Sequence, residues 1–203
     1  MLIIGITGGS GCGKSTVSKL YCDIYGAATI DADEVYHDLL NNSAPMMKEL
    51  KRRFPEAVTG DKLNRKTLAG IVFSDKAALS DLNDIAHKFI IEETERRMSV
   101  FYQRNAEYLC IDAIALFESG LDSICDVTIG VTAPRAQRIA RIINRDSIDS
   151  MSASARINAQ PDDNFYIERC DYMIANNGNM DEIRLEAERI FNIITKGTDD
   201  TDE

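Results

Sequence analysis

Five short segments of the chain are apolar without alternating polar residues, a pattern typical of parallel strands that are buried on both faces. These segments are residues 2–7, 27–30, 107–112, 127–131 and 172–175. Segments with helical periodicity lie between them, most clearly at 16–25, 135–144 and 181–195. The alternation of strands and helices predicts an α/β fold, in which about five parallel strands are joined by right-handed crossovers and flanked by helices.

The strands are unevenly spaced along the chain. About 75 residues separate the second predicted strand from the third, far more than one crossover helix needs. The region 34–105 is charged, rich in helix-forming residues and interrupted by Pro45 and Pro55, so it predicts a helical insertion beside the sheet. A second insertion is predicted at 134–169. The remaining segments, about 1–33, 106–133 and 170–197, form the core of a single domain spanning 1–197.

Composition places the chain among soluble globular proteins, because 44% of its residues are hydrophobic and 28% are charged. No apolar run approaches the roughly 18 residues of a membrane span, and the chain starts directly with a strand. We therefore expect a cytoplasmic protein that binds no membrane. The five cysteines are scattered without any C-x-x-C pair, which argues against a disulfide framework or a zinc site. Cys12 lies in a glycine-rich loop, where oxidants could reach it.

The net charge of −10 bears on possible partners. Four of the acidic residues lie within 198–203, which predicts a disordered tail. The rest of the chain is also acidic, and an acidic surface argues against nonspecific binding of nucleic acid. We expect a monomer or a weak homo-oligomer.

The segment from Gly8 to Ser15 fits the phosphate-binding pattern G-x-x-x-x-G-K-[ST], and it lies between a predicted strand and a predicted helix. Glycines let backbone N–H groups converge on a polyphosphate at the first turn of the helix. Lys14 supplies a positive charge for the phosphates, and the Ser15 hydroxyl is a ligand for Mg²⁺. The alternative is a glycine-rich turn with an incidental lysine. We expect a nucleoside triphosphate to contact residues Gly8, Gly9, Ser10, Gly11, Cys12, Gly13, Lys14, Ser15 and Thr16.

Acidic residues follow two of the predicted strands at the edge where α/β proteins bind ligands. Asp31 and Asp33 are two apart, so in an extended segment both carboxylates point the same way. Such a carboxylate could accept a proton from an attacking hydroxyl or hold Mg²⁺ through water, or it could simply cap the next helix. Asp112 ends a later apolar strand, as does the acidic element that holds Mg²⁺ in P-loop proteins. Glu118, six residues on, is a further candidate.

The segment 134–160 is basic within an acidic protein, and all its positive charges are arginines. Arg138, Arg141 and Arg145 lie at i, i+3 and i+7, on one face of a predicted helix. Such a stripe is commonly a solvated surface, but guanidinium groups also suit bidentate contact with phosphate. A mobile segment carrying these arginines could stabilise a transferring phosphoryl group and exclude water. Asn176 and Gly178, after the last strand, form a turn where this architecture could meet a nucleotide base.

Together these motifs resemble the dephospho-coenzyme A kinase family, and the resemblance covers nearly the whole chain. The ordered blocks that carry it are 4–15, 31–34, Arg65 with 68–73, 82–83 with His87, 116–121, 137–141, 145–146, Arg156 with Ile157 and Gln160, and 171–174 with Asn176 and Gly178. The chain differs from the usual family pattern at three places: Lys88 stands where the family has proline, 114–115 replace Pro-Leu, and the usual arginine near His37 is absent.

The resemblance implies a core like that of nucleoside monophosphate kinases, with 34–105 as the acceptor-binding insertion and 134–169 as an arginine-bearing lid. The implied reaction is ATP-dependent phosphorylation of the ribose 3′-hydroxyl of dephospho-coenzyme A, the last step of coenzyme A synthesis. Its partners would be ATP, dephospho-coenzyme A and Mg²⁺.

The roles that we predict follow from the motifs and this resemblance together. Asp33, Lys14, Arg141 and Arg145 would be catalytic; Arg141, Asn176 and Gly178 would complete the ATP site; Asp33, Arg65, His87, Asp112 and Glu118 would bind the acceptor; and Ser15 would bind Mg²⁺, with Asp31 or Asp112 acting through water. A nucleoside or nucleotide kinase on the same core remains an alternative. A GTPase-like switch is a further one, although the Asn-Lys-x-Asp motif of such proteins is absent.

Overall fold

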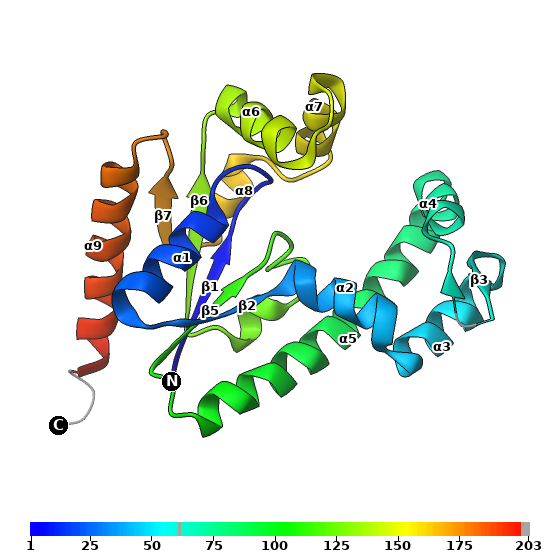
Figure 1. Cartoon of the computed structure of the whole chain (residues 1–203), viewed down its shortest axis with the longest axis horizontal. Coiled ribbons are helices and arrows are strands. Elements are labelled where there is room, and N and C mark those ends of the chain that lie inside the picture. The colour runs from blue at the N-terminus through cyan, green and yellow to red at the C-terminus, as the bar shows by residue number, and fades with distance from the viewer. Residues whose placement is uncertain (61, 200–203) are drawn as a thin grey trace.

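A parallel sheet of five strands forms the centre of the protein in the computed structural model, which describes residues 1–60 and 62–199, the last three as backbone only. The strand order is β2-β5-β1-β6-β7. Every pairing within this sheet is parallel. The carboxyl ends of the strands therefore share one edge, below α6 and α7 in Figure 1. The strands are β1 (Leu2–Thr7), β2 (Ala28–Asp31), β5 (Tyr108–Asp112), β6 (Val127–Thr132) and β7 (Tyr172–Ala175).

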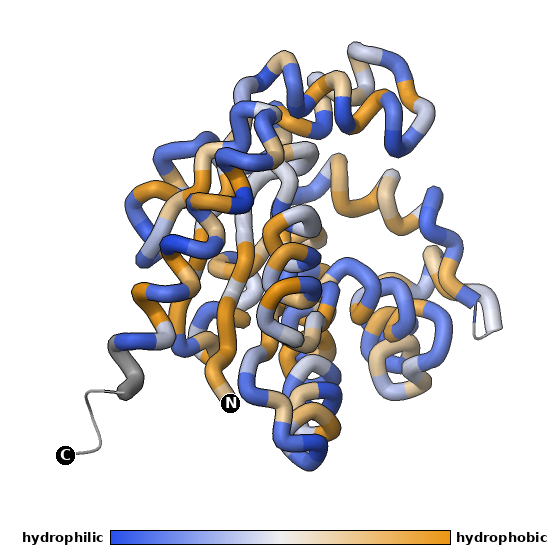
Figure 2. The backbone as a smooth tube through the Cα atoms, turned by 60° about the vertical axis from the view of Figure 1, so that its left-hand side comes forward, coloured by the Kyte–Doolittle hydropathy of each residue, from blue (hydrophilic) through white to orange (hydrophobic). Residues whose placement is uncertain are grey.

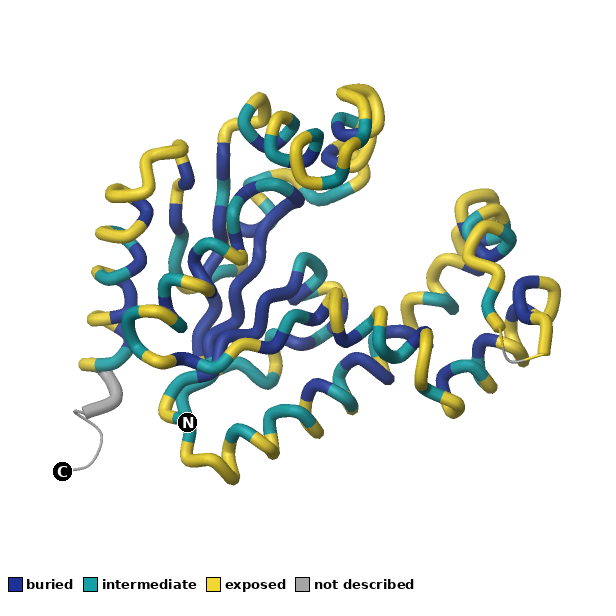
Figure 3. The backbone as a smooth tube through the Cα atoms, viewed as in Figure 1, coloured by how far each residue is buried: buried dark blue, intermediate teal, exposed yellow. Residues whose placement is uncertain are grey.

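Helices cover both faces of the sheet because successive strand residues point to opposite sides. In β5, Leu109 and Ile111 join the hydrophobic cluster that includes residues of α2 and α5, whereas Cys110 joins the cluster with α1 and α9. All three are fully buried, and Figure 3 shows the strands as the dark-blue centre of the molecule. The flanking helices are α1 (Lys14–Tyr25), α2 (Ala32–Asn42), α5 (Lys76–Gln103) and α9 (Met180–Asp199).

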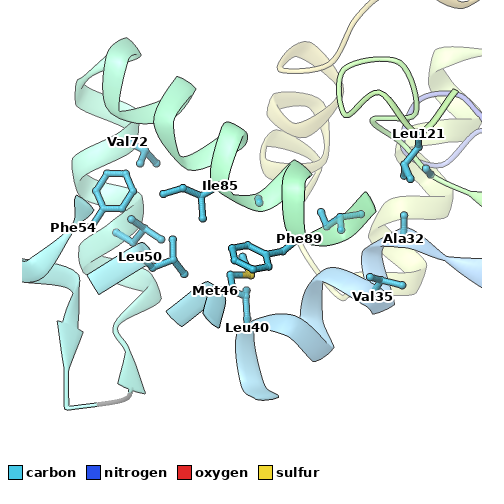
Figure 4. Packing of buried hydrophobic residues seen from close by; sticks show 14 of the residues in the cluster. Ala32, Val35, Leu40, Met46, Leu50, Phe54, Val72, Ile85, Phe89 and Leu121 are labelled. Atoms are coloured by element: carbon cyan, nitrogen blue, oxygen red, sulfur yellow. The ribbon is translucent and has the colours of Figure 1, made fainter. Parts of the chain in front are cut away.

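The region between β2 and β5 is a helical insertion that extends away from the sheet (Figure 1). The long helix α5 is its spine, and buried Phe89 and Ile85 of this helix lie over Leu40, Met46 and Leu50 (Figure 4). One hydrophobic cluster thus joins the insertion to the sheet. The other elements are α3 (Ala44–Arg53), a 3-10 turn η1 (Pro55–Ala57), the hairpin β3 (Val58–Thr59) and β4 (Lys62–Leu63), and α4 (Arg65–Ser74).

Two of the three helices between β6 and β7, α6 (Arg135–Asp146) and α7 (Ser150–Asn158), stand over the carboxyl edge of the sheet, and the third, α8 (Asp163–Ile167), lies lower, beside β6 (Figure 1). A small hydrophobic cluster built on Ile142, Ala153 and Ile157 holds α6 and α7 together, with the ion pair between Arg156 and Asp146 and the hydrogen bond from Arg135 to Asn158 beside it. In Figure 2 these helices alternate between hydrophobic and hydrophilic residues, while β1, which starts at the N label, is hydrophobic along most of its length. Such a small separate core is suited to a segment that moves as a unit.

The predicted α/β fold and all five predicted strands are confirmed, each within one residue at either end. The hairpin β3–β4 was not predicted, because two-residue strands are too short to show a period. The last helix is longer than predicted and continues to Asp199, so the predicted disordered tail is wrong for residues 198 and 199. Residues 200–203 of that tail lie outside the described residues.

Candidate active site

The loop between β1 and α1 presents the start of a helix without a side-chain cap. Gly13 precedes α1 with a φ of 103°, a left-handed conformation that favours glycine. A Cβ there would lie 2.2 Å from Nδ2 of Asn176, so no other residue would fit. No side chain caps the helix, and its first N–H groups therefore remain available for an anion. Lys14 is nearly buried, with 9% of its surface exposed, while Ser15 is exposed.

A buried carboxylate lies directly beside this helix start. Asp112, at the end of β5, accepts a hydrogen bond from the Ser15 hydroxyl at 2.9 Å and lies 3.5 Å from that of Ser18. Burial raises the pKa of Asp112, and the charges of Asp31 and Asp33 act in the same direction, whereas Lys14 and the Ser15 hydroxyl lower it. A cation next to Asp112 would relieve this cost. The hydroxyl and carboxylate oxygens are the hard ligands that Mg²⁺ prefers.

The two aspartates after β2 have different surroundings. Asp31 pairs in register with Asp112, and its Oδ1 accepts from the backbone N–H groups of Asp33 at 2.8 Å and Glu34 at 3.1 Å. Asp31 is therefore the N-cap of α2, one of the two roles that the sequence left open. The side chain of Asp33 is not used by this cap.

Asp33 lies on the first turn of α2 and is exposed, although neighbouring groups remove part of its hydration. Desolvation raises its pKa, the negative charge of Asp31 adds to this, and Lys14, His37 and Arg145 oppose it. The site thus holds a carboxylate whose affinity for a proton is higher than usual, close to the phosphate loop. Both properties are expected of a general base.

A cavity of about 200 Å³ opens beside Asp33, between α2, α5 and the segment after β5. Its walls are mostly apolar, and polar groups reach it at a few positions. The lining residues are Ala32, Asp33, Tyr36, Leu82, Asn83, Ala86, His87, Ile90, Ala113, Ile114, Ala115, Ser119 and Leu121. Burial lowers the pKa of His87, with Asp84 opposing the shift. An apolar hollow with a few polar groups is the usual form of a small-molecule site.

The other predicted acceptor residues lie outside this lining. Arg65 starts α4, is exposed and hydrogen-bonds the Asn41 side chain at 3.5 Å. Its charge lowers the pKa of Tyr36, which does line the cavity, although burial raises that pKa by more. Glu118 is exposed and acts on the pKa of Tyr166 in α8 instead. Of the five predicted acceptor residues, Asp33 and His87 are therefore the two that line the cavity.

The arginine stripe of α6 has two kinds of partner. Arg141 Nη1 donates to the phosphate-loop carbonyls of Gly11 and Cys12, at 3.1 and 3.2 Å, and its Nη2 donates to Asn176 Oδ1 at 2.8 Å. Arg145 instead pairs with Asp146 and stays exposed. Asp146 also pairs with Arg156, and both partners hold the pKa of Asp146 down at about 2. Arg145 is close enough to Asp33 for the two charges to affect each other's pKa.

Asn176 and Gly178, the predicted base-side residues, lie next to the phosphate loop. Asn176 is buried, and its Nδ2 donates to the carbonyl of Cys12 at 2.8 Å. Its Oδ1 accepts from Arg141 and from the N–H of Gly178. Cys12 is buried as well, and desolvation raises the pKa of its thiol, so the expectation that oxidants could reach it is wrong. The turn at Asn176 therefore supports the phosphate loop through the backbone of Cys12.

Sequence reasoning considered Arg138 only as part of the arginine stripe, with no contact to the phosphate loop, and gave no chemical role to Gln160 and Ser18. Arg138 and Gln160 contact the phosphate loop, and Ser18 faces Asp112. The i, i+3 spacing of Arg138 and Arg141 was the available signal for Arg138.

Within residues 1–60 and 62–199, no three His, Cys, Asp or Glu side chains form a group that could hold a metal ion. Among those residues, we find no helix that combines the length and the hydrophobicity of a membrane-spanning segment.

The chain is similar to a known family over most of its length. The family model described as dephospho-CoA kinase matches residues 2–182. A dephospho-CoA kinase of Syntrophotalea carbinolica is 34% identical over 186 residues, covering 91% of this chain and 88% of that protein. The crystal structure of TT1252 from Thermus thermophilus superposes with a TM-score of 0.80 at 31% identity, covering 95% and 96% of the two chains. Dephospho-CoA kinase from Campylobacter jejuni gives a TM-score of 0.65 at 26% identity, covering 97% and 98%.

Proposed function

The chain belongs to the dephospho-CoA kinase family, and on that basis we propose that it transfers the γ-phosphoryl group of ATP to the ribose 3′-hydroxyl of dephospho-coenzyme A, the final step of coenzyme A biosynthesis. The observation that carries this proposal is the place of Asp33. This carboxylate lines the cavity beside α5 and lies close enough to Lys14 for the two charges to interact. Phosphoryl transfer to a hydroxyl needs a general base that lies between the phosphate-binding loop and the cavity for the acceptor.

The donor side of the site is the start of α1. Backbone N–H groups of the loop would bind the polyphosphate, and Lys14 would neutralise its charge. Arg141 and Asn176 both hold the carbonyl of Cys12, so they keep the loop's N–H groups turned toward the phosphates. Asn176 and Gly178 would form the wall of the site that contacts the adenine base of ATP.

The acceptor side is the cavity lined by α2 and α5. Its apolar walls suit an aromatic base, and the ribose attached to that base would then lie at Asp33. His87 lies in the wall of the cavity, and Arg65, beside Tyr36, supplies a positive charge for the acceptor's phosphates farther out. We assign 34–105 to acceptor binding and 134–169 to a lid that closes over both substrates. Glu118 acts on the pKa of Tyr166 in the lid helix α8, and in this proposal it does not contact the acceptor.

Catalysis in this proposal rests on positioning and charge. Asp33 accepts the proton of the 3′-hydroxyl as the oxygen attacks phosphorus, and its raised pKa makes it a stronger base than an ordinary aspartate. Ser15 and Asp112 would hold Mg²⁺, which would neutralise charge on the phosphate oxygens. Arg145 leaves Asp146 when the lid closes and pairs with the transferring group, where a guanidinium stabilises the spread charge. Closure also excludes water that would otherwise hydrolyse ATP.

An ADP-release assay with a panel of acceptors tests this function. We expect ATP-dependent turnover with dephospho-coenzyme A at a rate at least about a hundredfold above that with adenosine, AMP or other nucleosides, because those lack the groups that reach the outer part of the insertion. Faster turnover with a nucleoside or nucleotide would contradict the proposal.

A further inference from the structure

The backbone of one phosphate-loop residue is held on both sides by the lid. The N–H of Ser10 donates to Gln160 Oε1 at 2.8 Å, and the carbonyl of Ser10 accepts from Arg138 Nε at 3.0 Å. Ser10 is 2% exposed and Arg138 5% exposed, so the bond between them is shielded from water, while Gln160 is half-buried. Gln160 follows α7 and Arg138 lies in α6. Two separate parts of the lid therefore meet at a single loop residue.

The two lid side chains also contact each other. Arg138 Nη2 lies 3.5 Å from Gln160 Oε1, and its Nη1 lies 3.4 Å from Asp163 Oδ1 at the start of α8. The guanidinium thus links Ser10 to the beginning of α8 and the end of α7 at once. We call Arg138, Gln160 and Asp163 the Ser10 clasp.

The glycines of the loop fit closely against this clasp. Gly9 has no positive φ, yet a Cβ there would lie 2.0 Å from Arg138 Nη2. A Cβ on Gly11 would lie 2.7 Å from the carbonyl oxygen of Arg138. Gly9 therefore leaves room for the arginine rather than providing backbone freedom. The phosphate loop therefore packs tightly against the first turn of α6.

We propose that the Ser10 clasp is a positioning device, which holds the phosphate loop in its binding shape and ties that shape to the position of the lid. Arg138 and Gln160 are then positioning residues for ATP, acting through Ser10 without touching the phosphates. This inference rests on the proposed function in taking ATP as the donor. It assigns no contact with the acceptor, so its effects should appear on the nucleotide side alone.

The key variant is Gln160→Met, which keeps the length of the side chain but removes the oxygen that accepts from Ser10. A buried N–H without a partner is costly, so the loop should leave its binding shape. We expect the Kd for ATP, measured by calorimetry without acceptor, to rise about tenfold. The KM for dephospho-coenzyme A should stay within about twofold. Hydrogen exchange at the Ser10 amide should become faster in the free protein.

Two further variants separate this role from general damage to the lid. Asn158→Ala removes a lid hydrogen bond two residues away, the one from Arg135 Nη2 at 2.8 Å, which does not reach the loop. It should leave the Kd for ATP unchanged. Gln160→Glu restores an oxygen acceptor for Ser10 and should return the Kd to within about threefold of the wild-type value. Circular dichroism would show that each variant is folded.

Three results would overturn the clasp: ATP binding by Gln160→Met as tight as in the wild type, an equal loss in Asn158→Ala, or an equal rise in the KM for the acceptor. Binding of ATP is measured without the acceptor. A wild-type protein that binds ATP but does not phosphorylate dephospho-coenzyme A would therefore contradict the proposed function and leave the test of the clasp intact.

Discussion

Replacing Asp33 by asparagine tests the proposed base without changing the shape of the site. The amide has the size of the carboxylate but cannot accept a proton from the acceptor hydroxyl. General base catalysis contributes on the order of 10²–10⁴ in rate, or about 3 to 5 kcal/mol of transition-state stabilisation. We expect kcat to fall within that range while the KM for ATP stays within about threefold, because Asp33 is not part of the phosphate loop.

The neighbouring Asp31 provides a matched control. Its Oδ1 caps α2 through the N–H groups of Asp33 and Glu34. Asparagine is as good an N-cap as aspartate, so Asp31→Asn removes one negative charge near the site and preserves the local fold. We expect kcat for Asp31→Asn to fall no more than about fivefold. Steady-state ADP release with saturating dephospho-coenzyme A would measure both variants side by side.

Stability separates a lost base from a damaged fold. Because the pKa of Asp33 is raised, the folded state binds this proton more tightly than the unfolded state does. The stability that this carboxyl contributes is therefore lost as pH rises through its folded pKa, and at neutral pH its charge is a burden. Asp33→Asn should unfold at the same temperature as the wild type or slightly higher. Turnover within about threefold of wild type, or an equal loss in Asp31→Asn, would refute the assignment of the base.

Three other predictions concern the lid, pH and the metal. Arg145→Ala should lower kcat about 10³-fold. The control Arg135→Ala should lower kcat less than about threefold, because the partner of Arg135 is Asn158, which lies away from the loop. Equal losses in a steady-state assay would contradict the role of Arg145. The acid limb of kcat/KM should have its midpoint above 3.8, the ordinary aspartate pKa, because burial and Asp31 raise the pKa of Asp33; a midpoint at or below that value would be inconsistent with this base. Chelation by EDTA should abolish turnover and Mg²⁺ should restore it, with Ser15→Ala needing on the order of tenfold more Mg²⁺; full activity in EDTA would exclude the metal site.

Local pattern was enough to predict the sheet. Strands buried on both faces, such as β5 with Leu109, Cys110 and Ile111, require uniform apolar runs, and such runs can be read directly from the sequence. The strand, glycine-rich loop and helix that contain residues 8–15 could be predicted for a similar reason, because the motif consists of consecutive residues. The hairpin β3–β4 could not, since two-residue strands have no period to detect.

Site residues that act through distant partners could not be predicted in this way. Arg138 contacts Ser10 across 128 positions of sequence, and nothing near either residue indicates the pairing. The stripe of three arginines was read as one surface, but Arg138 is buried against the loop while Arg145 is exposed. Asp31 and Asp33 were expected to point the same way in an extended segment. The helix α2 begins between them at Ala32, so one becomes the cap and the other faces the site.

The position of the transferred phosphate tests the central claim most directly. Purified protein would be incubated with ATP, Mg²⁺ and dephospho-coenzyme A, and the product examined by mass spectrometry and by phosphorus–proton correlation in nuclear magnetic resonance. The account predicts one added phosphate, coupled to the proton on the ribose 3′ carbon, and one ADP formed for each product molecule. A phosphate at any other position of the acceptor, or release of ADP with no phosphorylated acceptor, would contradict it.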